Sequence, residues 1–241
     1  MGCVGGSADT GAAAKGGVQS ARGTSELWRR DPPWAAIYAY FVRNERLGRV
    51  LGRLFMQTDA TKLYDAAMII GEMPDGSAIL DIPCGGGVAL RGLRSEQKVR
   101  YVAADIGEAM LERTRRIAEQ RGLDQVEYRQ ADVEQLPFAD GEFDLVVSFT
   151  GLHCFPDPHA AVKEIVRCIA PGGRLSGSSM VKRGEWMYAF TQIPGRMMGL
   201  LGPGQTADEL RTWFEEAGLE DIVFELSGPA AYFTARRAAA A

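Results

Sequence analysis

The sequence predicts an α/β fold with an open sheet, and three observations support that expectation. Short apolar runs recur at strand length, between stretches whose apolar spacing of three and four indicates helices. The run before Pro83 is apolar almost without interruption, which is typical of a strand buried on both faces. Several runs end in an acid that is followed by a helix or a loop, so polar side chains are expected to gather at one edge of the sheet.

The individual elements follow from these patterns in chain order. Helices are expected where apolar residues recur three and four positions apart, and strands where apolar runs are bounded by turn residues. The expected helices are 34–55, 59–73, 89–94, 108–121, 159–169 and 207–217. The expected strands are 79–82, 99–104, 126–130, 143–149, 174–181, 220–226 and 231–234.

The chain is expected to hold one α/β domain preceded by two other segments. Residues 1–25 are rich in Gly, Ala, Ser and Thr and are expected to form a flexible tail. Residues 26–77 are expected to be an N-terminal helical segment that docks on the domain, acts as part of a lid or, because apolar and arginine faces coexist in it, lies on a membrane surface. The domain spans 78–241, and its apolar, glycine-rich insertion at about 182–206 is expected either to cover the site as a lid or to pack on the sheet edge.

Composition restricts the class of partner. A hydrophobic content of 46%, a charged content of 24% and a net charge of −4 are typical of a soluble globular protein and argue against a nucleic-acid surface. The 4 cysteines and 2 histidines show no metal-ligand spacing, so no metal site is expected. Because signal-peptide and disulfide patterns are absent, we expect a cytoplasmic protein. The longest apolar stretches have strand length, so we expect at most peripheral membrane contact, and we expect a monomer or homodimer.

The residues after the first strand resemble a ligand cradle. Glycines at 85 to 87 leave room for close backbone approach, and Asp81 lies at the strand's carboxyl end, where open α/β sheets bind ligands. A dinucleotide, and with it an NAD-dependent enzyme, fits less well, because the third glycine of G-x-G-x-x-G would fall on Leu90. An acid beside a glycine turn suits a cationic ligand, and S-adenosylmethionine (SAM) carries both an α-amino group and a sulfonium.

Two further acids extend this prediction along the sheet edge. Asp105 ends the second strand, where its carboxylate can accept hydrogen bonds from a ribose diol, and Ile106 can pack on an adenine face. Asp132 follows the third strand and can accept from an adenine amino group, with the amide of Val133 donating to a ring nitrogen. Each acid alone could instead cap a helix or form an Asx turn, but their joint occurrence with the glycine turn favours SAM.

Five segments carry a family resemblance: ILDIPCGGG, YVAADIGEAML, ADVEQLPFADGEFDLVVS, GLHCFPDP and IAPGGRL. In this order they resemble class I SAM-dependent methyltransferases of the ubiquinone/menaquinone-biosynthesis-like group (methyltransferase type 11). The resemblance implies a Rossmann-like sheet of strand order 3-2-1-4-5-7-6 with the last strand antiparallel. Pro83 stands where the family motif D-x-G-C/T-G-x-G usually has its first glycine. The cofactor-binding residues implied are Asp81, Pro83, Cys84, Gly85, Gly87, Asp105, Ile106, Asp132, Val133 and Phe149.

The expected activity is methyl transfer from SAM to an oxygen or carbon of a small, apolar or lipid-like acceptor. His153 follows the fourth strand and is the candidate general base, with a packing or hydrogen-bonding role as the alternative. Two other interpretations stay open at this point. One is a C-methyltransferase of the quinone-biosynthesis type, and the other is a SAM-binding regulatory module without transferase activity.

Overall fold

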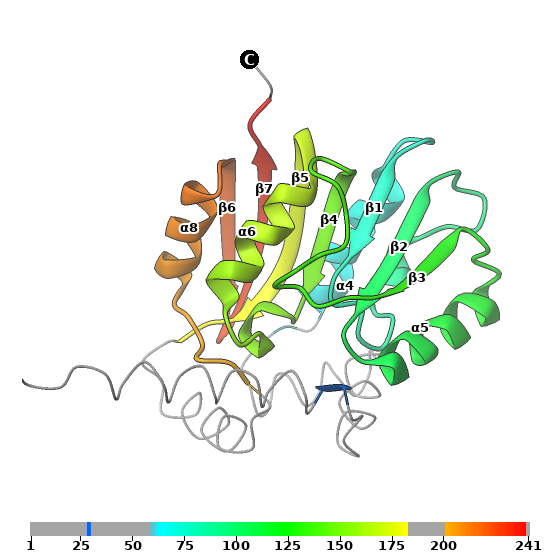
Figure 1. Ribbon diagram of the computed structural model, residues 1–241, viewed down its shortest axis with the longest axis horizontal. Helices are drawn as coiled ribbons and strands as arrows, with labels where there is room; N and C mark the ends of the chain where they lie inside the picture. Colours follow the sequence, from blue (N-terminus) through cyan, green and yellow to red (C-terminus); the bar gives the residue numbers. More distant parts are fainter. Residues whose placement is uncertain (1–27, 30–58, 60, 183–200, 240–241) are drawn as a thin grey trace, which may run out of the picture.

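The computed structural model describes residues 28–29, 59, 61–182 and 201–239. Within them the chain forms one seven-stranded sheet in the order β3-β2-β1-β4-β5-β7-β6 (Figure 1). The strands are β1 (Ala78–Asp81), β2 (Arg100–Asp105), β3 (Val126–Gln130), β4 (Phe143–Phe149), β5 (Ile169–Met180), β6 (Leu219–Ser227) and β7 (Ala230–Arg237). This order confirms the expected Rossmann-like α/β topology.

Strand direction places the ends that matter for a ligand at one edge. β1 pairs in parallel with β2 and β4, β2 pairs in parallel with β3, and β4 pairs in parallel with β5. β7 is antiparallel to both β5 and β6, as expected for the last strand. The carboxyl ends of β1 to β5 therefore meet at the lower edge of the sheet in Figure 1.

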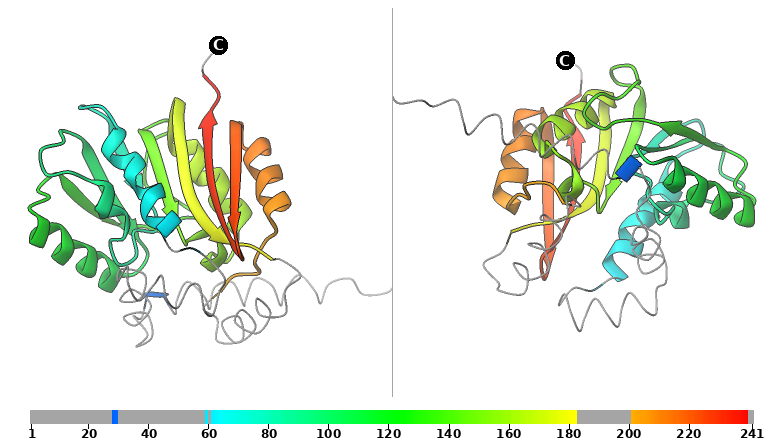
Figure 2. Two further views of the ribbon diagram at one scale, coloured as in Figure 1. Left: turned by 180° about the vertical axis from the view of Figure 1, so that it is seen from behind. Right: turned by 60° about the horizontal axis from the view of Figure 1, so that its bottom comes forward.

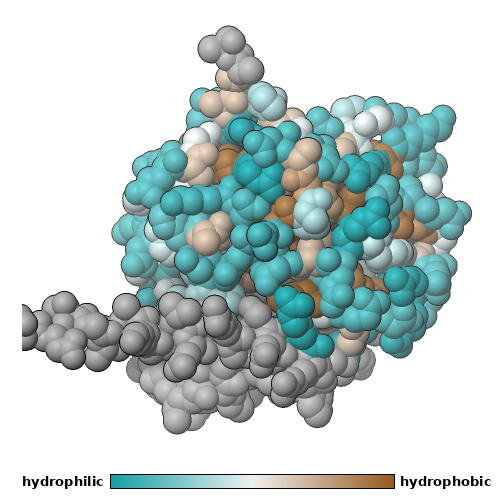
Figure 3. Space-filling model, viewed as in Figure 1, coloured by the Kyte–Doolittle hydropathy of each residue, from teal (hydrophilic) through white to brown (hydrophobic). Residues whose placement is uncertain are grey.

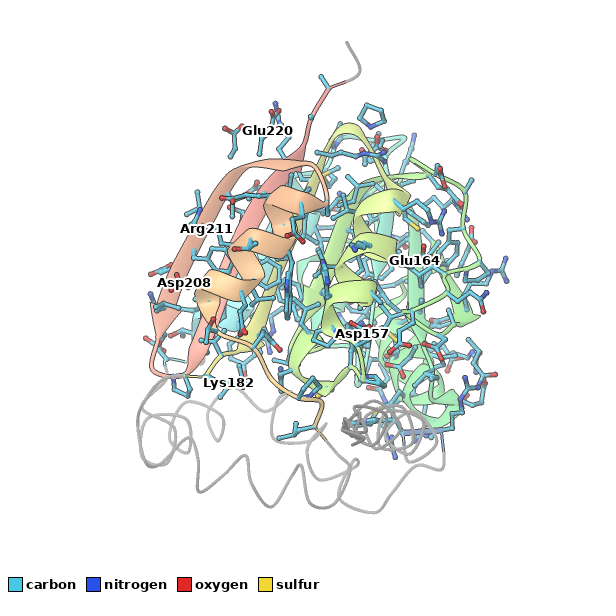
Figure 4. The ribbon with its side chains drawn as sticks, turned by 60° about the vertical axis from the view of Figure 1, so that its left-hand side comes forward. Asp157, Glu164, Lys182, Asp208, Arg211 and Glu220 are labelled. Carbon is cyan, nitrogen blue, oxygen red and sulfur yellow. The ribbon has the colours of Figure 1, made fainter. Side chains whose placement is uncertain are left out.

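Helices cover both faces of the sheet (Figure 2). One face carries α4 (Thr61–Ala67), the 3-10 helices η2 (Met68–Glu72) and η3 (Ala89–Gly92), and α5 (Glu108–Arg121). The other face carries α6 (Pro158–Cys168) and α8 (Ala207–Glu216), with the short η4 (Leu152–Cys154) after β4. Asp157 and Asp208 lie at the starts of α6 and α8, which run side by side (Figure 4). The surface on this side is largely hydrophilic, with small apolar areas between polar residues (Figure 3).

The core confirms that the central strands are buried on both faces. Because successive side chains of a strand point to opposite faces, Ile79 packs in one apolar cluster and Leu80 in the other. Tyr101 and Val102 of β2 divide between the same two clusters, and all four side chains are 0% exposed. The central strands are therefore packed between two apolar layers.

Local signals explain where several helices begin and end. Asp157 caps α6 by accepting the amide of Ala160, and Pro158 occupies the first turn. Thr206 and Glu209 form a capping box at the start of α8. Gly122 ends α5 with a left-handed conformation, at φ +62°, so the predicted bounds of that helix are confirmed.

Some expected bounds need correction. The helix expected at 89–94 is only the short η3, because Leu93 turns extended and the Gly92 backbone lies against the carbonyl of Ala67. The helix expected at 59–73 is α4 continued by η2. β5 begins at Ile169, ahead of the expected start at 174, because Ile169 already pairs with Phe143 before a register shift. The expected tail 1–25, the helix 34–55 and most of the insertion 182–206 lie outside the described residues, so these remain predictions.

Candidate active site

The glycine turn forms despite Pro83. The amide of Cys84 donates to the carbonyl of Ala104 on β2 at 2.8 Å, and the amide of Gly87 closes the turn on the Cys84 carbonyl at 2.9 Å. Gly85 and Gly87 have φ of +49° and +79°, which side-chain-bearing residues rarely adopt. A Cβ built at Gly85 would meet no atom of the described residues within 4 Å, so none of them fills this side of the turn.

Asp105 ties the glycine turn to the start of α5. One carboxylate oxygen accepts the amide of Gly85 and the other accepts the amide of Gly107, both at 2.9 Å. The residue is 4% exposed, and burial raises its pKa to about 6, although the backbone amides oppose this shift. A carboxylate has about four acceptor positions, so Asp105 keeps capacity for further donors.

Asp81 is a buried carboxyl group, and one of its two oxygens accepts a hydrogen bond from a neighbouring strand. It is 1% exposed, and its Oδ2 accepts the hydroxyl of Tyr101 at 2.8 Å. Its Oδ1 is buried and has no hydrogen-bond partner in the part of the chain that the structure describes. Burial raises its pKa to about 8, against the hydrogen bond from Tyr101 and with a contribution from the charge of Asp105. A cationic or N–H donor beside the glycine turn would satisfy this oxygen.

Thr114 on α5 donates a hydrogen bond to the glycine turn. Its hydroxyl lies 2.9 Å from the carbonyl oxygen of Gly85 and 3.6 Å from the sulfur of Cys84. Cys84 is 2% exposed, and burial raises the pKa of its thiol well above the usual value. Cys84 therefore acts here as a packed, neutral side chain.

The third acid lies at the same sheet edge but in a more open position. Asp105 pairs with Gln130 in the β2–β3 ladder, which places Asp132 just beyond that pair. Asp132 accepts the amide of Glu134 at 3.2 Å, and its other oxygen lies 3.5 Å from a guanidinium nitrogen of Arg29. Val133 is 5% exposed and packs in the core, while Ile106 stays half-buried. The structure thus brings the three acids to one edge, and their cofactor contacts remain predictions.

His153 lies on the side of β4 and β5. It belongs to η4, is 6% exposed, and its Nδ1 accepts the backbone amide of Met180 at 3.3 Å. Burial lowers its pKa to about 4, so the ring is neutral near pH 7 and carries its proton on Nε2. Phe149, the last residue of β4, is 3% exposed and packs on the same face of the sheet as Ala89 and Leu111.

Several residues that hold this site together were missed by the sequence analysis. Tyr101, Thr114 and Gln205 are the main ones, and the side-chain amide of Gln205 donates to the hydroxyl of Ser179 at 2.7 Å and to the carbonyl of Met180 at 3.4 Å. Tyr101 had a signal: a tyrosine in a strand of small and aliphatic residues needs a buried partner for its hydroxyl. Thr114 and Gln205 had none, because their partners are set by packing between distant segments.

The described residues contain neither a metal-binding cluster nor a membrane-spanning helix. No group of three or more His, Cys, Asp or Glu side chains there could hold a metal ion. No helix in the described ranges is long and apolar enough to cross a membrane.

Comparison with known proteins gives one family match and several relatives. A family model described as a methyltransferase domain matches residues 80–176. The chain is 33% identical over 159 residues to a ubiquinone biosynthesis O-methyltransferase of Pseudomonas aeruginosa, covering 61% of this chain and 67% of that protein.

Two solved structures illustrate the shared fold. A phosphoethanolamine N-methyltransferase of Haemonchus contortus, solved with S-adenosylhomocysteine (SAH), has a TM-score of 0.68 at 17% identity. The match covers 89% of this chain and 60% of that chain. A SAM-dependent methyltransferase of Aquifex aeolicus has a TM-score of 0.54 at 20% identity, covering 77% and 92%. Likeness at these identities concerns the fold alone, so the sequence matches carry the assignment of family.

Proposed function

The chain belongs to the SAM-dependent methyltransferase family, and from this premise we propose that it methylates an oxygen atom of a small, apolar or lipid-like acceptor. The cofactor follows from the family, whereas the acceptor and the role of each residue are proposals. The preference for oxygen rests on the Pseudomonas relative, whose name specifies O-methylation in ubiquinone biosynthesis. Methyl transfer to carbon is the competing outcome of the experiment below.

The observation that supports the cofactor site best is the buried Oδ1 of Asp81, which has no hydrogen-bond partner among the described residues and lies next to the glycine turn. SAM suits this acceptor, because its α-amino group offers N–H donors and a positive charge to a buried carboxylate. In our proposal Asp81 and the turn from Pro83 to Gly87 hold the methionyl part. Asp105 and Ile106 hold the ribose and the adenine edge, and Asp132 and Val133 hold the adenine base. Phe149 lies at the sulfonium end.

When bound, SAM supplies an activated methyl group together with its own leaving group. The protein then has to orient the acceptor and keep water out, and such positioning can supply about 7–11 kcal/mol of the barrier. The rigid sheet edge, buried on both faces, is suited to hold groups in fixed positions.

We propose His153 as the residue on the acceptor side. Its Nδ1 is engaged by the Met180 amide, so in this tautomer the ring offers an Nε2–H to an acceptor oxygen. To serve as the general base, the ring would have to carry its proton on Nδ1 and give up the hydrogen bond from Met180. A depressed pKa of about 4 keeps the ring neutral in either case.

Methyl transfer from labelled SAM tests the proposal. The panel should pair hydroxylated apolar compounds with matched analogues in which the hydroxyl is already methylated. We expect label only in the hydroxylated members, with SAH released in equal amount, and strong loss in Asp81→Ala. Label on a carbon, located by fragmentation in a mass spectrometer, would replace oxygen by carbon as the acceptor. No transfer to any member, despite SAH binding, would refute the acceptor class.

A further inference from the structure

The ring of Pro83 lies directly against the backbone of Gly151. A Cβ added at Gly151 would stand 2.3 Å from Cδ and 2.8 Å from Cγ of Pro83, and 3.1 Å from the ring of Phe155. Real Cβ atoms do not come that close to ring carbons. Gly151 itself has φ −95° and ψ −51°, a conformation open to any residue, so only the lack of space excludes a side chain.

Pro83 cannot make the kind of backbone hydrogen bond that holds the residues on either side of it. The amide of Ile82 donates to Val147 on β4 at 3.0 Å, and the amide of Cys84 donates to Ala104 on β2 at 2.8 Å. Pro83 has no amide hydrogen to donate, so its lateral position is set by what its ring packs on. The contact with Gly151 is therefore a steric support for the start of the glycine turn.

Gly151 belongs to a segment that is itself firmly held. The amide of Thr150 donates to the Ser178 carbonyl on β5 at 2.9 Å, and the amide of Cys154 donates back to the Gly151 carbonyl at 2.8 Å. Thr150 has a φ of +56°, which is unusual for a β-branched residue and is maintained by these contacts. The same short segment carries His153, so the Pro83–Gly151 contact joins the cofactor turn to the acceptor side.

We propose that Gly151 is a positioning residue. Because it has no side chain, the Pro83 ring packs directly on its backbone, and this contact fixes the position of the glycine turn relative to the segment that carries His153. This inference rests on the proposed assignment of the turn to SAM. In this chain the room for a proline ring at that motif position comes from the missing side chain of Gly151.

Three variants test the contact: Gly151→Ala, Pro83→Gly, and the double variant. SAH is the probe, titrated calorimetrically, and urea unfolding is measured on the same samples. We expect Gly151→Ala to weaken SAH binding at least tenfold, because the new methyl group displaces the Pro83 ring. In the double variant that ring is gone, so affinity should return to within threefold of Pro83→Gly alone. Gly76→Ala, at the other edge of the sheet and at φ +90°, is the control: it should lower stability but leave SAH affinity unchanged.

The outcomes separate the inference from the proposed function. If Gly151→Ala does not fold, recovery of folding and SAH binding in the double variant supports the contact in the same way. SAH affinity of Gly151→Ala within twofold of the wild type overturns the proposal, and so does a double variant that regains neither folding nor binding. Failure of the wild type itself to bind SAH refutes the cofactor site. In that case the contact between Pro83 and Gly151 would still be tested by urea unfolding. The shift in midpoint of the double variant should differ from the sum of the shifts of the two single variants.

Discussion

Replacement of Asp81 by Asn tests whether this carboxyl group is as poorly solvated as the structure indicates. In the folded protein its pKa is raised from 3.8 to about 8, chiefly by burial. Between these two values the folded state holds a proton that the unfolded state has released. Stability of the cofactor-free wild type should therefore fall as pH rises through this window. Asn cannot ionise, so Asp81→Asn should not share this decline.

The size of the effect follows from the same two values. Each pH unit inside the window changes the free energy of unfolding by about 1.4 kcal/mol for a single proton. From about pH 5 to about pH 7 the wild type should thus lose about 2 to 3 kcal/mol relative to Asp81→Asn. The difference in the free energy of unfolding between the two proteins should become constant above about pH 8, where Asp81 is ionised in both the folded and the unfolded state.

Urea unfolding of both proteins without cofactor, across this pH range, measures the difference directly. Asp105, also raised in pKa, is present in both proteins and contributes nearly equally to each curve. Tyr101→Phe is a useful companion, because it removes the hydrogen bond that lowers the pKa of Asp81, so the decline should continue to higher pH. The free energy of unfolding of the wild type minus that of Asp81→Asn should decrease as pH rises, and a value that stays constant or increases would refute the assignment.

Three further predictions concern the site with ligand bound. SAH affinity of the wild type should rise from about pH 6 to about pH 8, as Asp81 more readily gives up its proton to become the anion that pairs with the ligand ammonium; calorimetry should find this slope absent in Asp81→Asn. His153→Asn keeps an acceptor near the Met180 amide but loses the ring N–H, so kcat should fall about 10- to 100-fold with little change in SAH affinity. Equal loss of affinity and kcat would indicate a structural role instead. Thr114→Val removes the hydroxyl that supports Gly85, and SAH binding should weaken about fivefold, in line with ~1 kcal/mol for one hydrogen bond. An unchanged dissociation constant would show that Thr114 does not support the turn.

Local patterns in the sequence were enough to place most of the helices and strands along the chain. The bounds of β3, β4 and α5 agree with prediction because apolar periodicity and flanking glycines are local properties of the chain. The strand order came from the family resemblance, since periodicity does not say which strand lies beside which. The glycine turn and the acids at the strand ends were visible because each one belongs to a short continuous motif.

The hydrogen bonds, burial and steric contacts between these groups became visible only in the three-dimensional structure. The β1–β2 register places the Tyr101 hydroxyl on Asp81, and burial between two apolar layers raises the pKa of that carboxyl group. The turn after β4 faces His153 toward the Met180 amide and sets Gly151 against Pro83. These contacts join residues far apart in the chain. Burial and hydrogen bonding depend on three-dimensional packing, which no local pattern encodes.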